Sequence, residues 1–343
     1  MDGLSNGRWY NPGHLPGAGS GIKLQRVIID TDPGIDDAAA ILMALASPEL
    51  SVDAVTTVFG NGPVDRCTAN ARRVLLAAGR TDIPVYQGAA KPLVRPPNAG
   101  WALHIHGDDA LGNTGFPLPA DTSQPGESRH AALELVDRVM ASPGEITIVA
   151  LGRLTNVALA MSLESRFAQS VARIVVMGGA VYVPGNVSPV ASANLYEDPE
   201  AAAIVYSSGA PLAQVGLDVC NQVNISRAQL EQIQQAGKAT TKLLAAATPS
   251  LHDSYVERGL LKKEEGVRYN DMPAIAFMVD PDLFGCSDMF VEIETHSTTA
   301  RGQTVAQRAG PGVPPPNATV CLDVDGGRVA RLFTERIVGY VAP

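Results

Sequence analysis

The stretch VIIDTDPGIDDAAAILMALA, residues 27–46, decides the fold, because an apolar run meets an Ala-rich run across a Pro-Gly turn. The run that ends at Asp30 has no polar alternation, which is typical of a strand in a sheet covered on both faces. Pro33 and Gly34 predict the turn, and the residues after them predict a helix that ends before Pro48. The stretch is therefore expected to form the first strand–turn–helix unit of an α/β fold.

The same alternation continues along the chain. Apolar segments predict six strands, at residues 25–30, 51–60, 83–88, 145–152, 171–179 and 211–219. Amphipathic or Ala-rich segments predict the intervening helices, at residues 35–47, 64–79, 127–142, 154–165 and 198–209. Strands that alternate with helices indicate a mainly parallel sheet with right-handed crossovers.

The C-terminal third has a different pattern. It is expected to be helical from Ser226 to about Val279, to add strands at residues 289–295 and 317–324, and to close with a helix at residues 328–340. We therefore predict a single α/β domain over residues 22–343, with a doubly wound (Rossmann-like) sheet and an added helical C-terminal region. The Gly, Pro and Asn content of residues 1–21 predicts a flexible N-terminal tail.

Composition excludes several classes of protein. The chain has 343 residues, 45% of them hydrophobic, which is enough for a large core. Its net charge of −9 argues against a nucleic-acid partner, and no apolar run approaches the ~20 residues of a membrane span. The four cysteines form no C-x-x-C pair, which argues against a zinc site or disulfide framework and favours a reducing, cytoplasmic compartment.

Four carboxylates crowd the junction between the first strand and the first helix: Asp30, Asp32, Asp36 and Asp37. Like charges this close repel each other. Helix capping would explain one of them, because an aspartate at a helix N-terminus binds the free N–H groups there. Four exceed that need, and carboxylate oxygens are the preferred ligands of hard divalent cations. The cluster therefore predicts a Ca²⁺ or Mg²⁺ site.

Seven segments, in order, resemble the sequence blocks of the nucleoside hydrolases, which cleave nucleosides to ribose and free base. They are DTDPGIDD (30–37), TTVFGN (56–61), IHGDDALG (105–112), LGRLTNVALA (151–160), MGGAVYVPGN (177–186), NLYEDPEAA (194–202) and GLDV (216–219). The resemblance implies the doubly wound fold of that family, a bound Ca²⁺ and a nucleoside substrate. It also implies a homodimer or homotetramer.

The resemblance further implies a role for each matching residue. Asp32 would act as the general base on water, and the calcium ligands would be Asp32, Asp37, the main-chain carbonyl of Leu151, and Asp271. Asp30 would support this cluster. The ribose would be bound by Asp36, Asn61, Met177, Asn186 and Asn194, and His106 would lie near the base. Trp101 and Tyr255 are candidates for stacking on the base, although each could instead serve only to anchor its own segment.

Two positions depart from the common family pattern. Asn270 stands where many members have a histidine that helps the leaving base depart, and an amide cannot act as an acid at neutral pH. Because a purine can depart after protonation at N7, this departure predicts a modest preference for purine nucleosides. Ser192 stands where many members have a glutamate that contacts the 5′ side of the sugar. A water could fill that gap, or the substrate could carry a different 5′ substituent.

These features predict calcium-dependent hydrolysis of the N-glycosidic bond of ribonucleosides, in nucleoside salvage or catabolism. Alternatives are a family member with a different N-riboside substrate and a nucleoside-binding relic with little turnover. A phosphatase with a D-x-D motif fits poorly, because Gly34 and the additional pair Asp36-Asp37 do not match that class. A second metal site at His104 and His106 is not required, because the carboxylates already account for one cation.

Overall fold

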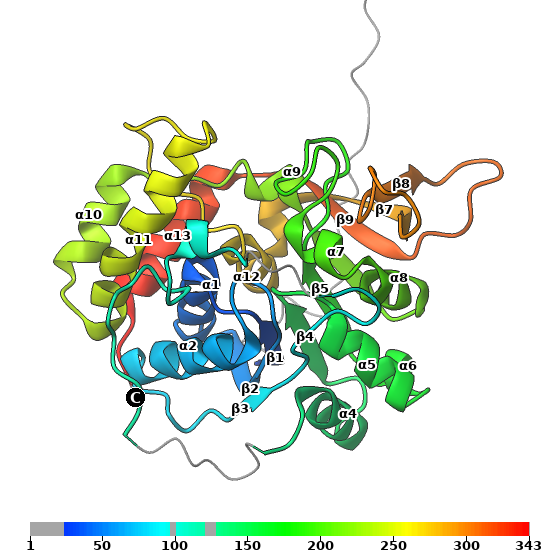
Figure 1. Ribbon diagram of the computed structural model, residues 1–343, viewed down its shortest axis with the longest axis horizontal. Helices are drawn as coiled ribbons and strands as arrows, with labels where there is room; N and C mark the ends of the chain where they lie inside the picture. The colour runs from blue at the N-terminus through cyan, green and yellow to red at the C-terminus, as the bar shows by residue number, and fades with distance from the viewer. Residues whose placement is uncertain (1–23, 97–100, 121–127, 343) are drawn as a thin grey trace, which may run out of the picture.

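The computed structural model describes residues 24–96, 101–120 and 128–342. The predicted tail, residues 1–21, lies outside the described residues. The described residues build one nine-stranded sheet in the order β3-β2-β1-β4-β5-β6-β9-β7-β8 (Figure 1). The strands are β1 (Gln25–Thr31), β2 (Leu50–Thr57), β3 (Val85–Gln87), β4 (Ile146–Ala150), β5 (Arg173–Met177), β6 (Leu212–Val215), β7 (Phe284–Ile293), β8 (Thr304–Arg308) and β9 (Ala318–Val324).

The sheet is mainly parallel and doubly wound, as the sequence predicted. Every neighbouring pair from β3 to β9 is parallel, whereas β7 runs antiparallel to both β9 and β8. All eight predicted strands are present. Strand β8 was missed, because it is a short edge strand whose side chains are mostly accessible to solvent, so its sequence carries no apolar run.

Helices follow most strands, as expected. They are α1 (Ile35–Leu45), α2 (Val64–Ala77), α3 (Leu103–His106), α4 (Ala131–Ala141), α5 (Thr155–Leu163), α6 (Phe167–Ser170), α7 (Ala193–Glu197), α8 (Pro199–Ser207), α9 (Leu217–Cys220), α10 (Arg227–Gln235), α11 (Ala239–Glu257), α12 (Met272–Val279) and α13 (Gly326–Gly339), with a 3₁₀ turn η1 (Pro281–Leu283). The helical C-terminal region and the closing helix were predicted. The short helices α3, α6, α7 and α9 were not.

The sheet separates two hydrophobic cores. Successive side chains of a strand point to opposite faces, so Val27 and Ile29 of β1 belong to one core and Ile28 to the other. The first core packs against α1, α2 and α11 to α13, and the second against α4, α5 and α8. Figure 1 shows α1, α11 and α13 on one side of the sheet and α5 and α8 on the other. Burial on both faces explains why the strands lack polar alternation.

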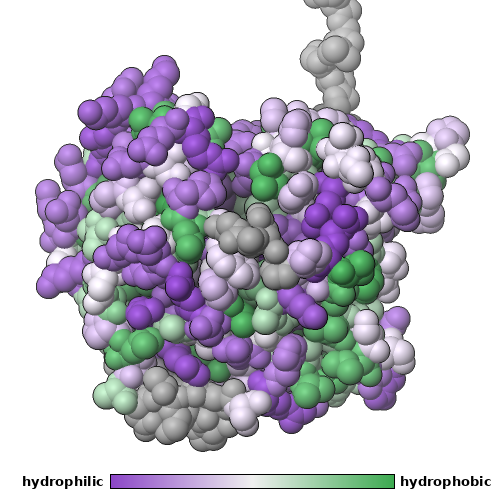
Figure 2. Space-filling model, viewed as in Figure 1, coloured by the Kyte–Doolittle hydropathy of each residue, from purple (hydrophilic) through white to green (hydrophobic). Residues whose placement is uncertain are grey.

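The described surface is of mixed polarity. Hydrophilic and hydrophobic side chains are interspersed over the face drawn in Figure 2. Among the described helices, none combines the length and hydropathy that a bilayer span requires.

The carboxyl ends of the parallel strands meet at one edge of the sheet. Chain segments that follow β1, β2, β4, β5 and β6 all contribute to a single pocket there. In open α/β sheets, ligands bind beyond this edge, so the topology itself places the candidate site.

Candidate active site

A pocket of about 490 Å³ occupies the carboxyl edge of the sheet. That volume lies within the ~300–1,000 Å³ of typical small-molecule sites. It brings together thirteen of the residues that the sequence singled out: Asp32, Asp36, Asn61, Trp101, His106, Leu151, Met177, Asn186, Ser192, Asn194, Tyr255, Asn270 and Asp271. The other two, Asp30 and Asp37, are fully buried and do not line the pocket.

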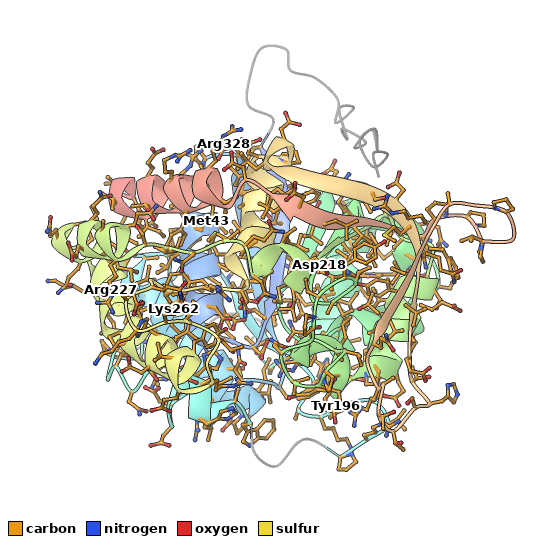
Figure 3. All side chains as sticks on the ribbon, turned by 90° about the horizontal axis from the view of Figure 1, so that it is seen from above. Met43, Tyr196, Asp218, Arg227, Lys262 and Arg328 are labelled. Carbon is orange, nitrogen blue, oxygen red and sulfur yellow. The ribbon has the colours of Figure 1, made fainter. Side chains whose placement is uncertain are left out.

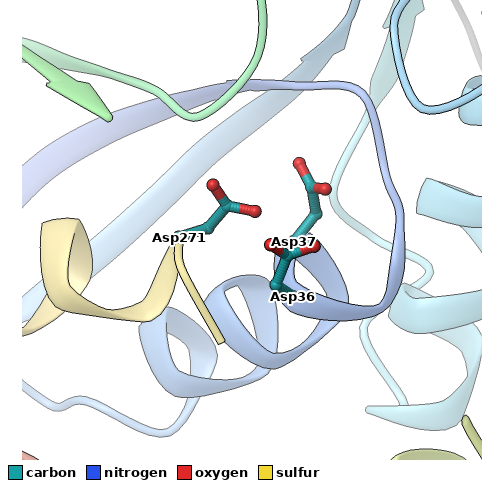
Figure 4. Close-up of side chains that lie close together, drawn as sticks. All are labelled: Asp36, Asp37 and Asp271. Carbon is teal, nitrogen blue, oxygen red and sulfur yellow. The ribbon is translucent and has the colours of Figure 1, made fainter. Parts of the chain in front are cut away.

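Three buried carboxylates converge beside the pocket. Figure 4 shows Asp36 and Asp37 on α1 and Asp271 at the start of α12. One oxygen from each lies within 4.8 Å of the others. Two segments separated by more than two hundred residues thus supply one acidic cluster, as the sequence predicted.

The protein holds Asp37 and Asp30 firmly. Oδ2 of Asp37 accepts hydrogen bonds from the backbone N–H of Gly34 and from Nδ2 of Asn61, both at 2.9 Å. Its Oδ1 accepts one from the hydroxyl of Thr31. Oδ1 of Asp30 accepts hydrogen bonds from Oγ1 of Thr56 at 2.6 Å and from the side-chain Nδ2 of Asn156 on α5 at 2.8 Å. Asp30 therefore anchors the end of β1 to its neighbours.

The cluster is electrostatically unfavourable without a cation. Burial raises the pKa of Asp30 to about 7 and that of Asp36 to about 6. Burial, followed by repulsion from neighbouring carboxylates, also raises the pKa of Asp37 and Asp271. Oδ1 of Asp36 is buried and has no hydrogen-bond partner among the described residues. Carboxylate oxygens are the ligands that a hard divalent cation prefers, so Asp37 and Asp271 fit such an ion, and the free Oδ1 of Asp36 is left for a ligand beside it.

Asp32 lies beside this cluster and is held from two sides. Its Oδ2 accepts a hydrogen bond from the backbone N–H of Asn61 at 2.7 Å and another from Nη1 of Arg153. A Cβ on Gly60 would lie 2.2 Å from both Oδ2 of Asp32 and Nη1 of Arg153, so glycine is needed there. Burial raises the pKa of Asp32 well above its usual range, and the positive charge of Arg153 opposes that shift.

Sequence reasoning missed Arg153 and its second partner, Glu197. The guanidinium is 2% exposed and forms an ion pair of 2.8 Å with Glu197. Both residues line the pocket. The signal was present, since a charged side chain interrupts the apolar segment LGRLTNVALA, but an isolated arginine there is ordinarily read as a surface residue.

The residues expected to bind the sugar surround Asp32. Asn194 donates through Nδ2 to the carbonyl oxygens of Leu151 at 2.5 Å and Met177 at 3.0 Å. Its Oδ1 accepts from Arg153 at 3.2 Å. The side chain of Asn194 therefore ties together the ends of β4 and β5 and has only acceptor capacity left for a ligand.

The loop between β5 and α7 forms one wall of the pocket. Oδ1 of Asn186 accepts from the backbone N–H of Ala193 at 2.9 Å, and Oγ of Ser192 accepts from that of Gly179 at 2.8 Å. The carboxylate of Asp218, labelled in Figure 3, accepts from the backbone N–H groups of residues 181 and 182. These bonds fix the wall, because they satisfy backbone donors that a loop otherwise leaves exposed.

The opposite wall carries the residues expected near the base. Tyr255 on α11 accepts a hydrogen bond at its hydroxyl from Nδ2 of Asn270 at 2.8 Å. Oδ1 of Asn270 is buried and has no partner among the described residues. Nδ1 of His106 accepts from the backbone N–H of Ile35 at 3.2 Å, and burial lowers the pKa of His106 to about 4. His106 is therefore neutral at pH 7. Trp101 lines the pocket and packs against the small hydrophobic cluster of Val58, Phe59 and Ala89.

The fold and the site together define an α/β protein with a pocket of small-molecule size beside a buried aspartate cluster. The chain belongs to the nucleoside hydrolase family, because the sequence model of the family described as inosine-uridine preferring nucleoside hydrolase matches residues 27–331. The family expected from the sequence is thus confirmed, and with it the class of enzyme, an N-glycosidase.

Individual relatives cover nearly the whole chain. The chain is 37% identical to a probable uridine nucleosidase 2 of Arabidopsis thaliana, over 92% of this chain and 98% of the relative. It is 38% identical to the pyrimidine-specific ribonucleoside hydrolase RihA of Citrobacter koseri, over 92% of this chain and 99% of the relative. Among solved structures, a purine-preferring ribonucleoside hydrolase from Gardnerella vaginalis superposes with a TM-score of 0.86 at 28% identity. The superposition covers 92% of this chain and 99% of the other.

Proposed function

We propose that this protein hydrolyses the N-glycosidic bond of ribonucleosides, with calcium in the aspartate cluster and uridine among its good substrates. The observation that carries the proposal is the convergence of Asp36, Asp37 and Asp271 within 4.8 Å beside Asp32. The relatives at 37% and 38% identity carry names that specify uridine or pyrimidine nucleosides. They weigh against the purine preference expected from Asn270, so we place uridine first.

The residues of the pocket have separate roles in the proposed reaction. Asp32, Asp37, Asp271 and the main-chain carbonyl of Leu151 would hold the calcium ion, which would supply positive charge that lowers the pKa of a water and attracts the sugar hydroxyls. Asp32, oriented by Arg153 and Asn61, accepts the proton of the attacking water. Asp36 binds a ribose hydroxyl through the oxygen that lacks a partner. The carboxylates stabilise the positive charge that develops on the sugar in an oxocarbenium-like transition state.

A nucleoside panel tests this proposal. Uridine, cytidine, inosine and adenosine would each be incubated with the protein in calcium or in EGTA, and free base and ribose would be separated by chromatography. We expect base release in calcium alone, fastest with uridine. Binding of uridine without base release would instead support the nucleoside-binding relic. Hydrolysis of p-nitrophenyl phosphate with no nucleoside cleaved would contradict the proposal.

Leaving-group assistance gives a separate prediction at Asn270. Neither Asn270 nor the neutral His106 can protonate a departing base at pH 7. The Asn270→His variant places an imidazole within reach of Tyr255 and should raise kcat on uridine by roughly 10²-fold, the lower end of the ~10²–10⁴ range of general acids. The control substrate is p-nitrophenyl riboside, whose leaving group needs no proton. Equal changes on both substrates, or none on uridine, would show that a missing acid does not limit the reaction.

A further inference from the structure

A buried ion pair lines the pocket next to the aspartate cluster without belonging to it. Nε of Arg153 donates to Oε2 of Glu197 at 2.8 Å, and Nη2 lies 2.8 Å from the same oxygen. Oε1 of Glu197 has no hydrogen-bond partner among the described residues, although Glu197 lines the pocket. Glu197 thus presents one free carboxylate oxygen to any molecule bound there.

The free oxygen is held rigidly. Glu197 is the last residue of α7, and its backbone carbonyl accepts a hydrogen bond from Nη2 of Arg301 at 3.1 Å. The guanidinium of Arg301 also lies 4.8 Å from the ring centroid of Tyr196, which Figure 3 labels. Glu197 is therefore fixed by one arginine at its backbone and by another at its side chain, and such preorganisation favours selective binding.

Glu197 and the residues expected near the base come from opposite sides of the sheet. Leu195 of α7 packs in the core with α5 and α8, whereas Tyr255 of α11 packs in the core with α1 and α12. Figure 1 shows α7 and α11 on the two sides of the sheet. Arg153 pairs with both Asp32, which lies beside the aspartate cluster, and Glu197, so Glu197 lies close to the cluster on the α7 side of the pocket. A nucleoside whose base contacts Tyr255 would therefore direct the other end of its sugar towards Glu197.

The hydroxyl groups of the ribose then identify which part of the sugar contacts Glu197. This inference rests on the proposed function. A ribonucleoside carries three sugar hydroxyls, and the two vicinal ones are taken by the aspartate cluster with its cation. The third is the exocyclic 5′-hydroxyl. A carboxylate oxygen accepts a charge-assisted hydrogen bond from such a group, and repels an anionic substituent in its place.

We propose that Glu197, held by Arg153, binds the 5′-hydroxyl of the ribose and makes the enzyme selective for nucleosides with an unsubstituted 5′ end. Ser192 is less suited to this role, because its hydroxyl is neutral and cannot form a charge-assisted hydrogen bond. Arg153 acts here as a positioning residue, since it orients the carboxylate of Glu197.

The test compares uridine with 5′-deoxyuridine. The wild type should prefer uridine in kcat/KM by roughly 10- to 100-fold, as expected for a hydrogen bond to a charged group. The preference should fall in Glu197→Gln and nearly vanish in Glu197→Met, which keeps the side-chain length but offers only a weak thioether acceptor. Glu200→Gln is the matched control, because it removes a carboxylate from a 3.1 Å arginine pair outside the pocket. That control should keep the full preference.

Binding separates this inference from the proposed function. A carbon-linked nucleoside, whose bond to the base cannot be hydrolysed, and its 5′-deoxy analogue would be titrated calorimetrically into wild type and Glu197→Gln in calcium. Tighter binding of the 5′-hydroxyl compound that is weakened in Glu197→Gln supports the assignment, even if no nucleoside is cleaved. An undiminished preference in Glu197→Gln, or no preference in the wild type, overturns the assignment, even if uridine is cleaved.

Discussion

The Asp32→Asn variant is expected to lose nucleoside turnover by at least about 10³-fold while keeping its fold. The upper part of the ~10²–10⁴ range of general base catalysis applies, because the same substitution also removes a proposed calcium ligand. The native structure should survive, since Arg153 retains its ion pair with Glu197 and an amide oxygen can still accept from the backbone of Asn61. Base release under saturating uridine gives the change in kcat, and the melting temperature reports the fold.

A surface variant provides the control for Asp32→Asn. Asp82 pairs with Arg80 at 2.8 Å and is 64% exposed, so Asp82→Asn also removes one carboxylate from an arginine pair. Its turnover should stay at the wild-type level. If Asp32→Asn kept a kcat within a few fold of the wild type, Asp32 would not be the base.

Calcium should stabilise the protein more strongly as the pH rises. Burial raises the native-state pKa of Asp30 to about 7 and that of Asp36 to about 6, and raises those of Asp37 and Asp271. A carboxyl whose pKa is raised on folding binds its proton more tightly in the native state. The resulting stability is present below about pH 4 and is lost as the pH rises towards 7. The calcium-free protein should therefore lose this contribution over that range.

Thermal unfolding in calcium and in EGTA, at pH 5 and pH 7.5, measures this effect. At a calcium concentration 100 times the Kd, the gain is about 2.7 kcal/mol, which corresponds to a rise of roughly 5 °C in Tm. The rise should be larger at pH 7.5 than at pH 5, because protons compete with the cation for the carboxylates. The Asp271→Asn variant should lose most of the calcium response. A Tm that calcium leaves unchanged at pH 7.5 would argue against the metal site.

Much of the fold follows from local sequence patterns. Strands buried on both faces appear as continuous apolar runs, and helices between them carry one apolar face, so β1 to β6 and the long helices were predictable. Strand β8 was not, because it depends on pairing with β7 rather than on its own apolar residues.

The residues of the candidate site also fall into those that the sequence predicted and those that it did not. The aspartates were found because four carboxylates within eight residues have few explanations besides a cation. Arg153 and Glu197 were missed because their burial depends on distant partners. Asp32 lies 121 residues from Arg153 in sequence, and Glu197 lies 44 residues away. A buried charge is tolerated only when it is paired, and that pairing is visible only in three dimensions.

Calcium in the aspartate pocket is expected to be required for the cleavage of a ribonucleoside. The most direct measurement follows the release of uracil from uridine by protein treated with EGTA, before and after calcium is restored in excess. We expect negligible release in EGTA and recovery of uracil and ribose in equal amounts once calcium is added. Equal rates in the two conditions would contradict the role of calcium, and no uracil in either would contradict cleavage of uridine.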